Sequence, residues 1–164
     1  MKKYVLGVLL LSSVSVVAQH QHSFVEACMG TWKGTMYIYN KGVLRDSVAV
    51  RLTVAKTDQP EVWTWKTEYL SEKMPMTKDY LLRVRDAVKK QYVTDEGGGV
   101  ELLEYVFGNK MYCVFETNQV VLTSSYELRS ANELIFEVTS GKKQETSPVV
   151  NYSVDNLQRV VFRK

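Results

Sequence analysis

The chain has 164 residues, of which 45% are hydrophobic and 24% are charged, and its formal net charge is +3. This length suits one domain with its own core, and the sequence contains no internal repeat, low-complexity tract or heptad pattern. Nucleic-acid binding calls for a clustered basic face, whereas Lys89-Lys90 and Lys142-Lys143 are isolated pairs. We therefore predict a single globular domain with no nucleic-acid partner.

The first 18 residues have the pattern of a secretory signal peptide. Two lysines precede the apolar run 5–11, and a stretch of small residues ends at Ala18. The run is too short for a membrane anchor, which needs about 20 consecutive apolar residues. We expect residues 1–18 to be removed and residues 19–27 to form a flexible tail. The protein is then exported, to the periplasm or beyond, without stable membrane insertion.

From residue 30 onward, apolar and polar residues alternate in short runs. A period of two is typical of strands that bury one face. Val48, Val50, Leu52 and Val54, for example, are separated by residues that are mostly polar. About ten such runs are present, and other clear ones fall at 63–69, 80–85, 111–115, 134–138 and 160–162.

Short turns rich in glycine and asparagine, such as 40–42 and 97–99, separate the runs. They favour antiparallel neighbours, because a parallel crossover takes a dozen or more residues. Closing the sheet removes exposed edges. We predict an all-β fold for residues 28–164, an antiparallel up-and-down β-barrel of about 8–10 strands, with long loops at 71–78 and 144–156.

Both histidines, His20 and His22, lie before the first predicted strand. A body without histidine argues against Ser-His-Asp or Cys-His catalysis and against zinc or haem held by imidazole. The two imidazoles in the tail are better explained as part of a polar terminus than as a metal site. We predict no catalytic residues, no metal and no cofactor, and therefore a protein that is not an enzyme.

Carboxylate pairs and the triple glycine give no catalytic site either. The positions of Glu101 and Glu104 differ by three, an odd number, which places the two side chains on opposite faces of a strand. Asp95 and Glu96 lead into the glycines at 97–99, which suits a solvated hairpin tip. No helix follows these glycines, so they lack the helix N-terminus that gives phosphate-binding loops their affinity.

Cys28 and Cys113 are the two cysteines of the chain. In an oxidising compartment an even number favours a disulfide, which would tie the start of the first strand to a distant strand. The alternative is two separate buried thiols that pack as small apolar groups.

Aromatic residues are the strongest indication of function. Trp63, Trp65 and Tyr69 share one face of one strand, and a face of this kind suits an apolar or planar ligand. The same side chains would also fill a barrel that is packed solid. The predicted ligand-binding residues are Trp63, Trp65, Tyr69, Tyr80, Leu82, Phe115 and Phe136.

The segment Gly30-Thr31-Trp32 opens the first predicted strand, and Arg159 and Arg163 lie on the last. This arrangement resembles the calycin superfamily of lipocalins and fatty-acid-binding proteins. The resemblance implies that Trp32 is a structural plug at the closed end of the barrel, packed against Arg159. The short turn at 40–42 leaves no room for the helical lid of fatty-acid-binding proteins, and no C-terminal lipocalin helix follows the last strand.

The leading hypothesis is an exported lipocalin-like barrel that binds a small apolar or amphipathic molecule without changing it chemically. The alternative is a solid-cored structural or protein-interaction module of the bacterial envelope, with recognition in the loops around Pro75 and Pro148. The signal followed by Gln19 resembles exported proteins of Gram-negative bacteria, and a protein partner is not identified by the sequence.

Overall fold

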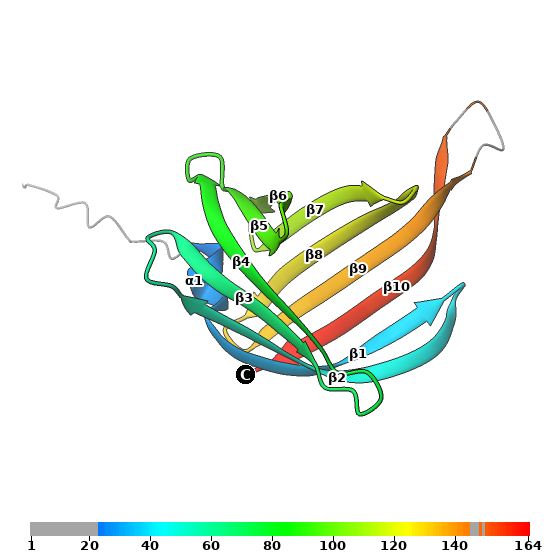
Figure 1. Ribbon diagram of the computed structural model, residues 1–164, viewed down its shortest axis with the longest axis horizontal. Helices are drawn as coiled ribbons and strands as arrows, with labels where there is room; N and C mark the ends of the chain where they lie inside the picture. Colours follow the sequence, from blue (N-terminus) through cyan, green and yellow to red (C-terminus); the bar gives the residue numbers. More distant parts are fainter. Residues whose placement is uncertain (1–22, 145–147, 149) are drawn as a thin grey trace, which may run out of the picture.

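The computed structural model describes residues 23–144, 148 and 150–164. Ten antiparallel strands follow a short helix, and they pair in sequence order while β1 also pairs with β10, which closes the barrel (Figure 1). The predicted fold class is therefore confirmed. The elements are α1 (Phe24–Cys28), β1 (Gly30–Asn40), β2 (Val43–Lys56), β3 (Val62–Tyr69), β4 (Met76–Asp86), β5 (Gln91–Gly97), β6 (Val100–Phe107), β7 (Lys110–Thr117), β8 (Val120–Ser130), β9 (Glu133–Gln144) and β10 (Asn151–Arg163).

The core is concentrated in the half of the barrel next to α1. Trp32 on β1 and Phe162 on β10 are fully buried near this end. Further along the same strands, Ile38 and Gln158 are only half-buried. Figure 1 shows α1 at one end of the barrel, and the end of β9 and the start of β10 at the other. The inward faces therefore become more accessible towards the end opposite α1.

The helix α1 differs from the flexible tail predicted for residues 19–27. Ser23 caps the helix by accepting a hydrogen bond from the backbone N–H of Glu26, and the Glu26 side chain accepts one from the backbone N–H of Ser23. Phe24, Val25 and Cys28 are buried against the barrel. The tail prediction is thus wrong from Ser23 onward, because a capping box and an apolar face fix this segment. The predicted signal segment, His20 and His22 lie outside the described residues.

Trp32 closes the barrel beneath α1, but its cationic partner is not the predicted Arg159. The indole Nε1 of Trp32 donates a hydrogen bond to the backbone oxygen of Cys28 at 2.7 Å. The Lys164 Nζ lies 4.2 Å from the centroid of the Trp32 ring system. Arg159 instead pairs with Glu137, at 3.3 Å between Nε and Oε2, with both side chains partly exposed. Arg159 occupies the opposite face of β10 from buried Val160, whereas Lys164 follows the last strand and reaches the indole.

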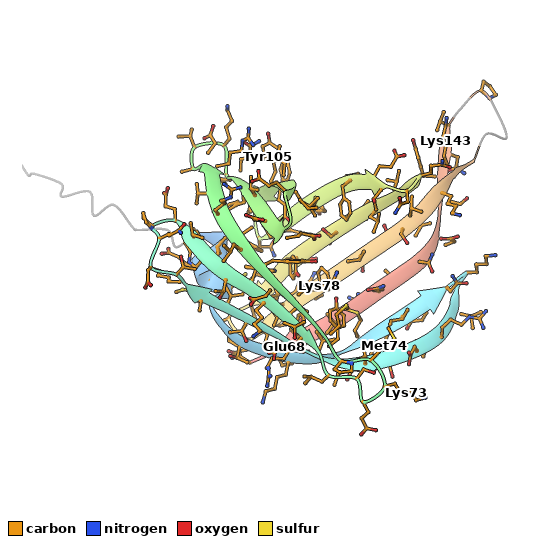
Figure 2. The ribbon with its side chains drawn as sticks, in the orientation of Figure 1. Glu68, Lys73, Met74, Lys78, Tyr105 and Lys143 are labelled. Atoms are coloured by element: carbon orange, nitrogen blue, oxygen red, sulfur yellow. The ribbon has the colours of Figure 1, made fainter. Side chains whose placement is uncertain are left out.

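The connections between strands are shorter than predicted. β4 begins at Met76 and β10 at Asn151, so both strands extend into the segments expected to be loops. Met74 lies in the connection between β3 and β4, where 79% of its surface is exposed (Figure 2). Among the residues that the structure describes, no helix is long and apolar enough to span a membrane.

One seam of the barrel is much weaker than the others. β6 and β7 pair over three positions only, from Tyr105 opposite Tyr112 to Phe107 opposite Lys110. By comparison, β7 and β8 pair along the whole of β7. The next position of the β6–β7 register would bring Glu104 opposite Cys113, and the strands are no longer paired there. The hydrogen bonding between β6 and β7 thus ends beside the inward side chains of Glu104 and Cys113.

The plug at Trp32 gives a stability prediction. Trp32→Phe removes the indole donor and leaves the buried oxygen of Cys28 without it, so we expect the free energy of unfolding to fall by about 1 to 3 kcal/mol. Arg159→Ala removes a surface ion pair and should change it by less than about 1 kcal/mol. Urea denaturation of both variants measures this difference. Equal losses would contradict the assignment of Trp32 to the Cys28 oxygen.

Candidate functional site

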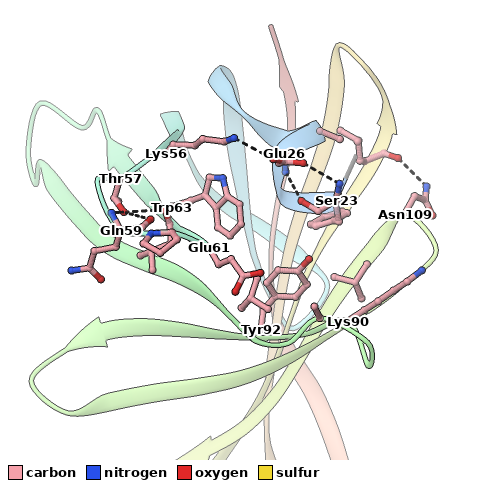
Figure 3. A pocket seen from close by; sticks show the side chains of 18 of the residues that line it. Ser23, Glu26, Lys56, Thr57, Gln59, Glu61, Trp63, Lys90, Tyr92 and Asn109 are labelled. Carbon is pink, nitrogen blue, oxygen red and sulfur yellow. Dashed lines mark hydrogen bonds and ion pairs between the residues drawn. The ribbon is translucent and has the colours of Figure 1, made fainter. Parts of the chain in front are cut away.

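A pocket of about 830 Å³ lies at the end of the barrel next to α1 (Figure 3), and we call it the α1 pocket. It is bounded by α1, by the turns after β2 and β4, and by inward residues of β3, β5, β6 and β8. Its volume falls in the range of pockets that hold small molecules, about 300 to 1,000 Å³. The inner wall is apolar and aromatic: Phe24, Trp63, Val84, Tyr92, Val106 and Leu128.

The rim of the α1 pocket is polar and carries both signs of charge. Lys56 and Glu26 form an ion pair across it, with 3.3 Å between Nζ and Oε1 (Figure 3). Glu61 and Lys90 add one further charge of each sign. An apolar wall beneath a polar rim suits an amphipathic molecule, whose polar end would remain at the rim.

Two aromatic side chains of the inner wall carry polar groups. Trp63 is 6% exposed, and its Nε1 has no hydrogen-bond partner among the described residues. Tyr92 is 7% exposed, and burial raises the pKa of its hydroxyl above the ordinary value. Its phenol therefore stays neutral at physiological pH and is able both to donate and to accept a hydrogen bond.

The structure divides the seven predicted ligand-binding residues among three places. Trp63 lines the α1 pocket. Trp65, Leu82 and Phe136 are buried in the core and do not line this pocket. The remaining three, Tyr69, Tyr80 and Phe115, are half-buried on their strands towards the opposite end. The aromatic face of β3 therefore serves both as packing and as pocket wall, which were the two alternatives left open by the sequence.

Three aromatic rings form a cluster in the middle of the barrel. Trp65 meets Tyr126 edge to face, with ring centroids 5.0 Å apart, and Tyr126 stacks on Phe136 at 4.3 Å. Offset and edge-to-face pairs of this kind add about 0.5 to 1.5 kcal/mol each beyond the area they bury. Tyr126 was not predicted, and nor were Tyr92 and Glu104.

Glu104 is a carboxylic acid buried inside the barrel. It is 4% exposed, and its Oε1 accepts a hydrogen bond from the Thr94 hydroxyl at 2.9 Å. Its Oε2 is buried without a hydrogen-bond partner among the described residues. Burial raises the pKa of Glu104 from 4.5 to about 7, against the lowering effect of Thr94, and the nearby charge of Glu96 raises it further. The opposite placement of Glu101, which is half-exposed and pairs with Arg83, was predicted correctly.

Cys28 and Cys113 are both free and buried, so the predicted disulfide is not formed. Cys28 is the last residue of α1, and the positive charge of Lys164 slightly lowers the pKa of its thiol. Cys113 lies on β7, near Glu104. Burial raises the pKa of each thiol to about 12. Both thiols therefore stay protonated and are weak nucleophiles, as the alternative prediction of two separate packed thiols requires.

The outer face of β6 and β7 carries exposed apolar side chains. Tyr105, Phe107 and Tyr112 pack on one another, and Phe107 is 66% exposed. Tyr105 is labelled in Figure 2. Leu103 and Val114 extend this surface along the two strands.

No cluster of three or more histidine, cysteine or acidic residues suited to a metal occurs in the part of the chain that the structure describes.

No protein-family model matches the chain, and no curated protein matches it in sequence. Solved structures do resemble it. The S-type phycobiliprotein lyase CPES from Guillardia theta superposes with a TM-score of 0.63 at 8% identity, over 86% of this chain and 90% of that one. Rv2717c from M. tuberculosis superposes with a TM-score of 0.53 at 16% identity, over 84% and 93%. At these identities the similarity establishes the barrel fold alone, which agrees with the calycin resemblance.

The prediction that this protein is not an enzyme is overturned by the first of these comparisons. A barrel of the same fold is named as a lyase, at a remote 8% identity. The exclusion depended on the absence of histidine from the barrel, and that absence removes only the mechanisms that use an imidazole.

The raised pKa of Glu104 gives a prediction about stability and pH. The folded protein holds this proton more tightly than the unfolded chain, so wild-type stability falls as the pH rises from about 4.5 to about 7. Glu104→Gln removes the ionisable group and keeps an oxygen for Thr94. At about 1.4 kcal/mol per pKa unit, its stability relative to wild type should rise by about 3 kcal/mol between pH 5 and pH 8.

Urea denaturation across this pH range measures the difference, and Glu101→Gln on the exposed face of β6 is the matched control. The control should leave the pH dependence of wild-type stability nearly unchanged. An equally steep fall with pH in wild type and in Glu104→Gln would show that Glu104 is not the group responsible.

Proposed function

We propose that this protein binds a small amphipathic molecule in the α1 pocket, with the apolar part of the molecule against Trp63 and Tyr92. One observation carries the proposal: a pocket of about 830 Å³ opens into the barrel between an apolar inner wall and a charged rim. The lipocalin-like barrel fold, shared with the two solved structures, is consistent with this role.

The packing of the barrel supports binding over the alternative of a solid-cored module. Trp32 and α1 fill one part of the barrel end, whereas the part beside β3, β5 and β6 remains hollow. The inner wall of the hollow is apolar, and covering it with a ligand would remove apolar surface from water, which is favourable. A ligand that covers about 100 Å² of this apolar surface would gain about 2.5 kcal/mol.

A fluorescent amphipathic probe, 1-anilinonaphthalene-8-sulfonate, tests the proposal by titration. Ala87 lies in the turn after β4 and lines the pocket. Ala87→Trp should fill the entrance and raise the dissociation constant about tenfold, which corresponds to about 1.4 kcal/mol. Ala27→Trp, from the α1 side, should have the same effect without altering the same turn.

Val88→Trp is the matched control, because Val88 is the next residue of the turn, is 94% exposed and does not line the pocket. Its affinity for the probe should equal that of wild type. If neither pocket-filling variant weakens binding, or if wild type binds no probe, the proposed function is wrong.

A further inference from the structure

Glu104 occupies a place in the barrel that its own contacts do not explain. It lies beside Tyr92 in the register of β5 and β6, and it is the next inward residue after Val106, so it continues the inner wall of the α1 pocket deeper into the barrel. Burying a carboxyl group without a full set of hydrogen bonds is costly. Thr94 satisfies Oε1, and Oε2 is left without a partner among the described residues.

The weak seam of the barrel begins at the same residue. β6 and β7 pair from Phe107 back to Tyr105, and the pairing stops before Glu104 and Cys113. Strands that are not hydrogen-bonded to each other separate at a lower energetic cost than paired ones, because no ladder bond has to be broken. Glu104 therefore lies where the wall of the barrel is easiest to open.

The surroundings of Glu104 select the kind of group that would bind there. Glu96 contributes a second negative charge nearby, and the Cys113 thiol stays protonated beside it. Tyr126 belongs to the aromatic cluster with Trp65 and Phe136, and the negative charge of Glu104 contributes to the raised pKa of its hydroxyl. A carboxylate oxygen accepts hydrogen bonds, and flat rings stack on aromatic clusters. An anionic group would be repelled.

We propose that Glu104 is a second recognition point of the barrel, at which its Oε2 accepts a hydrogen bond from an N–H group on a flat aromatic ligand. This inference rests on the proposed function and adds to it the chemical class of the ligand. The ligand enters from the α1 pocket, passes Tyr92, and places its N–H group where β6 and β7 separate. A hydrogen bond to a buried carboxylate gives this site its selectivity for a donor.

Two probes of nearly the same shape test the proposal. Carbazole carries a ring N–H, and dibenzofuran has an oxygen in its place. At pH 9, well above the pKa of about 7 at which Glu104 ionises, wild type should bind carbazole at least about tenfold more tightly, because the charged carboxylate accepts a hydrogen bond from its N–H group and dibenzofuran has no donor to offer. Quenching of tryptophan fluorescence reports both affinities. Glu104→Met keeps the length of the side chain without the acceptor, and should reduce the preference to less than about twofold.

Glu101→Met, on the opposite face of the same strand, is the matched control and should keep the wild-type preference. A second measurement needs no variant. In wild type labelled with ¹³C in its glutamate carboxyl groups, carbazole should shift the resonance that titrates with a pKa of about 7, and dibenzofuran should not.

Equal affinity of wild type for the two probes would overturn the inference. A preference that survives in Glu104→Met, or an unshifted carboxyl resonance on saturation with carbazole, would also overturn it. Any of these results, together with pocket-dependent binding of 1-anilinonaphthalene-8-sulfonate, leaves the proposed function intact. Failure of all three probes to bind overturns both.

Discussion

A closed sheet forces every second side chain of all ten strands into one shared interior, and the rest of the structure depends on how that interior is filled. Next to α1 it is filled by large apolar groups, with Trp32 and Phe162 fully buried. The aromatic cluster around Tyr126 occupies the middle. Beside β3, β5 and β6, the inward side chains leave part of the end next to α1 hollow, and that space is the α1 pocket.

Two polar interactions inside the barrel, one made by Trp32 and one by Glu104, have opposite consequences. The hydrogen bond from Trp32 to the Cys28 oxygen satisfies both of its atoms and fixes α1 against the barrel. The hydrogen bond from Thr94 satisfies only one oxygen of Glu104. A complete interaction stabilises one conformation, whereas an incomplete one costs free energy that a ligand is able to recover. Trp32 therefore belongs to the scaffold and Glu104 to the proposed site.

Much of the fold could be predicted from the sequence, because its strands bury one face and are joined by short turns. The period of two across Val48, Val50, Leu52 and Val54 identifies the inward face of β2 without ambiguity. The same reasoning gave an antiparallel barrel of about 8–10 strands, whereas Trp32 as a buried plug came from the resemblance to calycins. It missed α1, because five residues are too few to show a helical period.

The candidate site could be predicted only in part, and β6 shows why. Its outward face carries Leu103, Tyr105 and Phe107, while its inward face carries Glu104. A strand with apolar residues on both faces gives no periodic indication of which face is buried. The structure resolves this through the pairing of Tyr92 with Glu104, which is a contact between strands and leaves no local trace in the sequence.

The partner of Trp32 was missed for a different reason. Both arginines of β10 alternate with the buried Val160 and Phe162, and therefore face outward. Arg163 pairs there with Glu133, just as Arg159 pairs with Glu137. The resemblance to calycins predicted a cation from the last strand, and the structure supplies one from Lys164, the residue that follows it.

A crystal structure of the protein with 1-anilinonaphthalene-8-sulfonate tests the central claim most directly. The account predicts the naphthalene ring inside the α1 pocket, against Trp63 and Tyr92, with the sulfonate at the rim near Lys56 or Lys90. Probe bound instead on the outer face of β6 and β7, with the pocket filled by rearranged side chains, would contradict it.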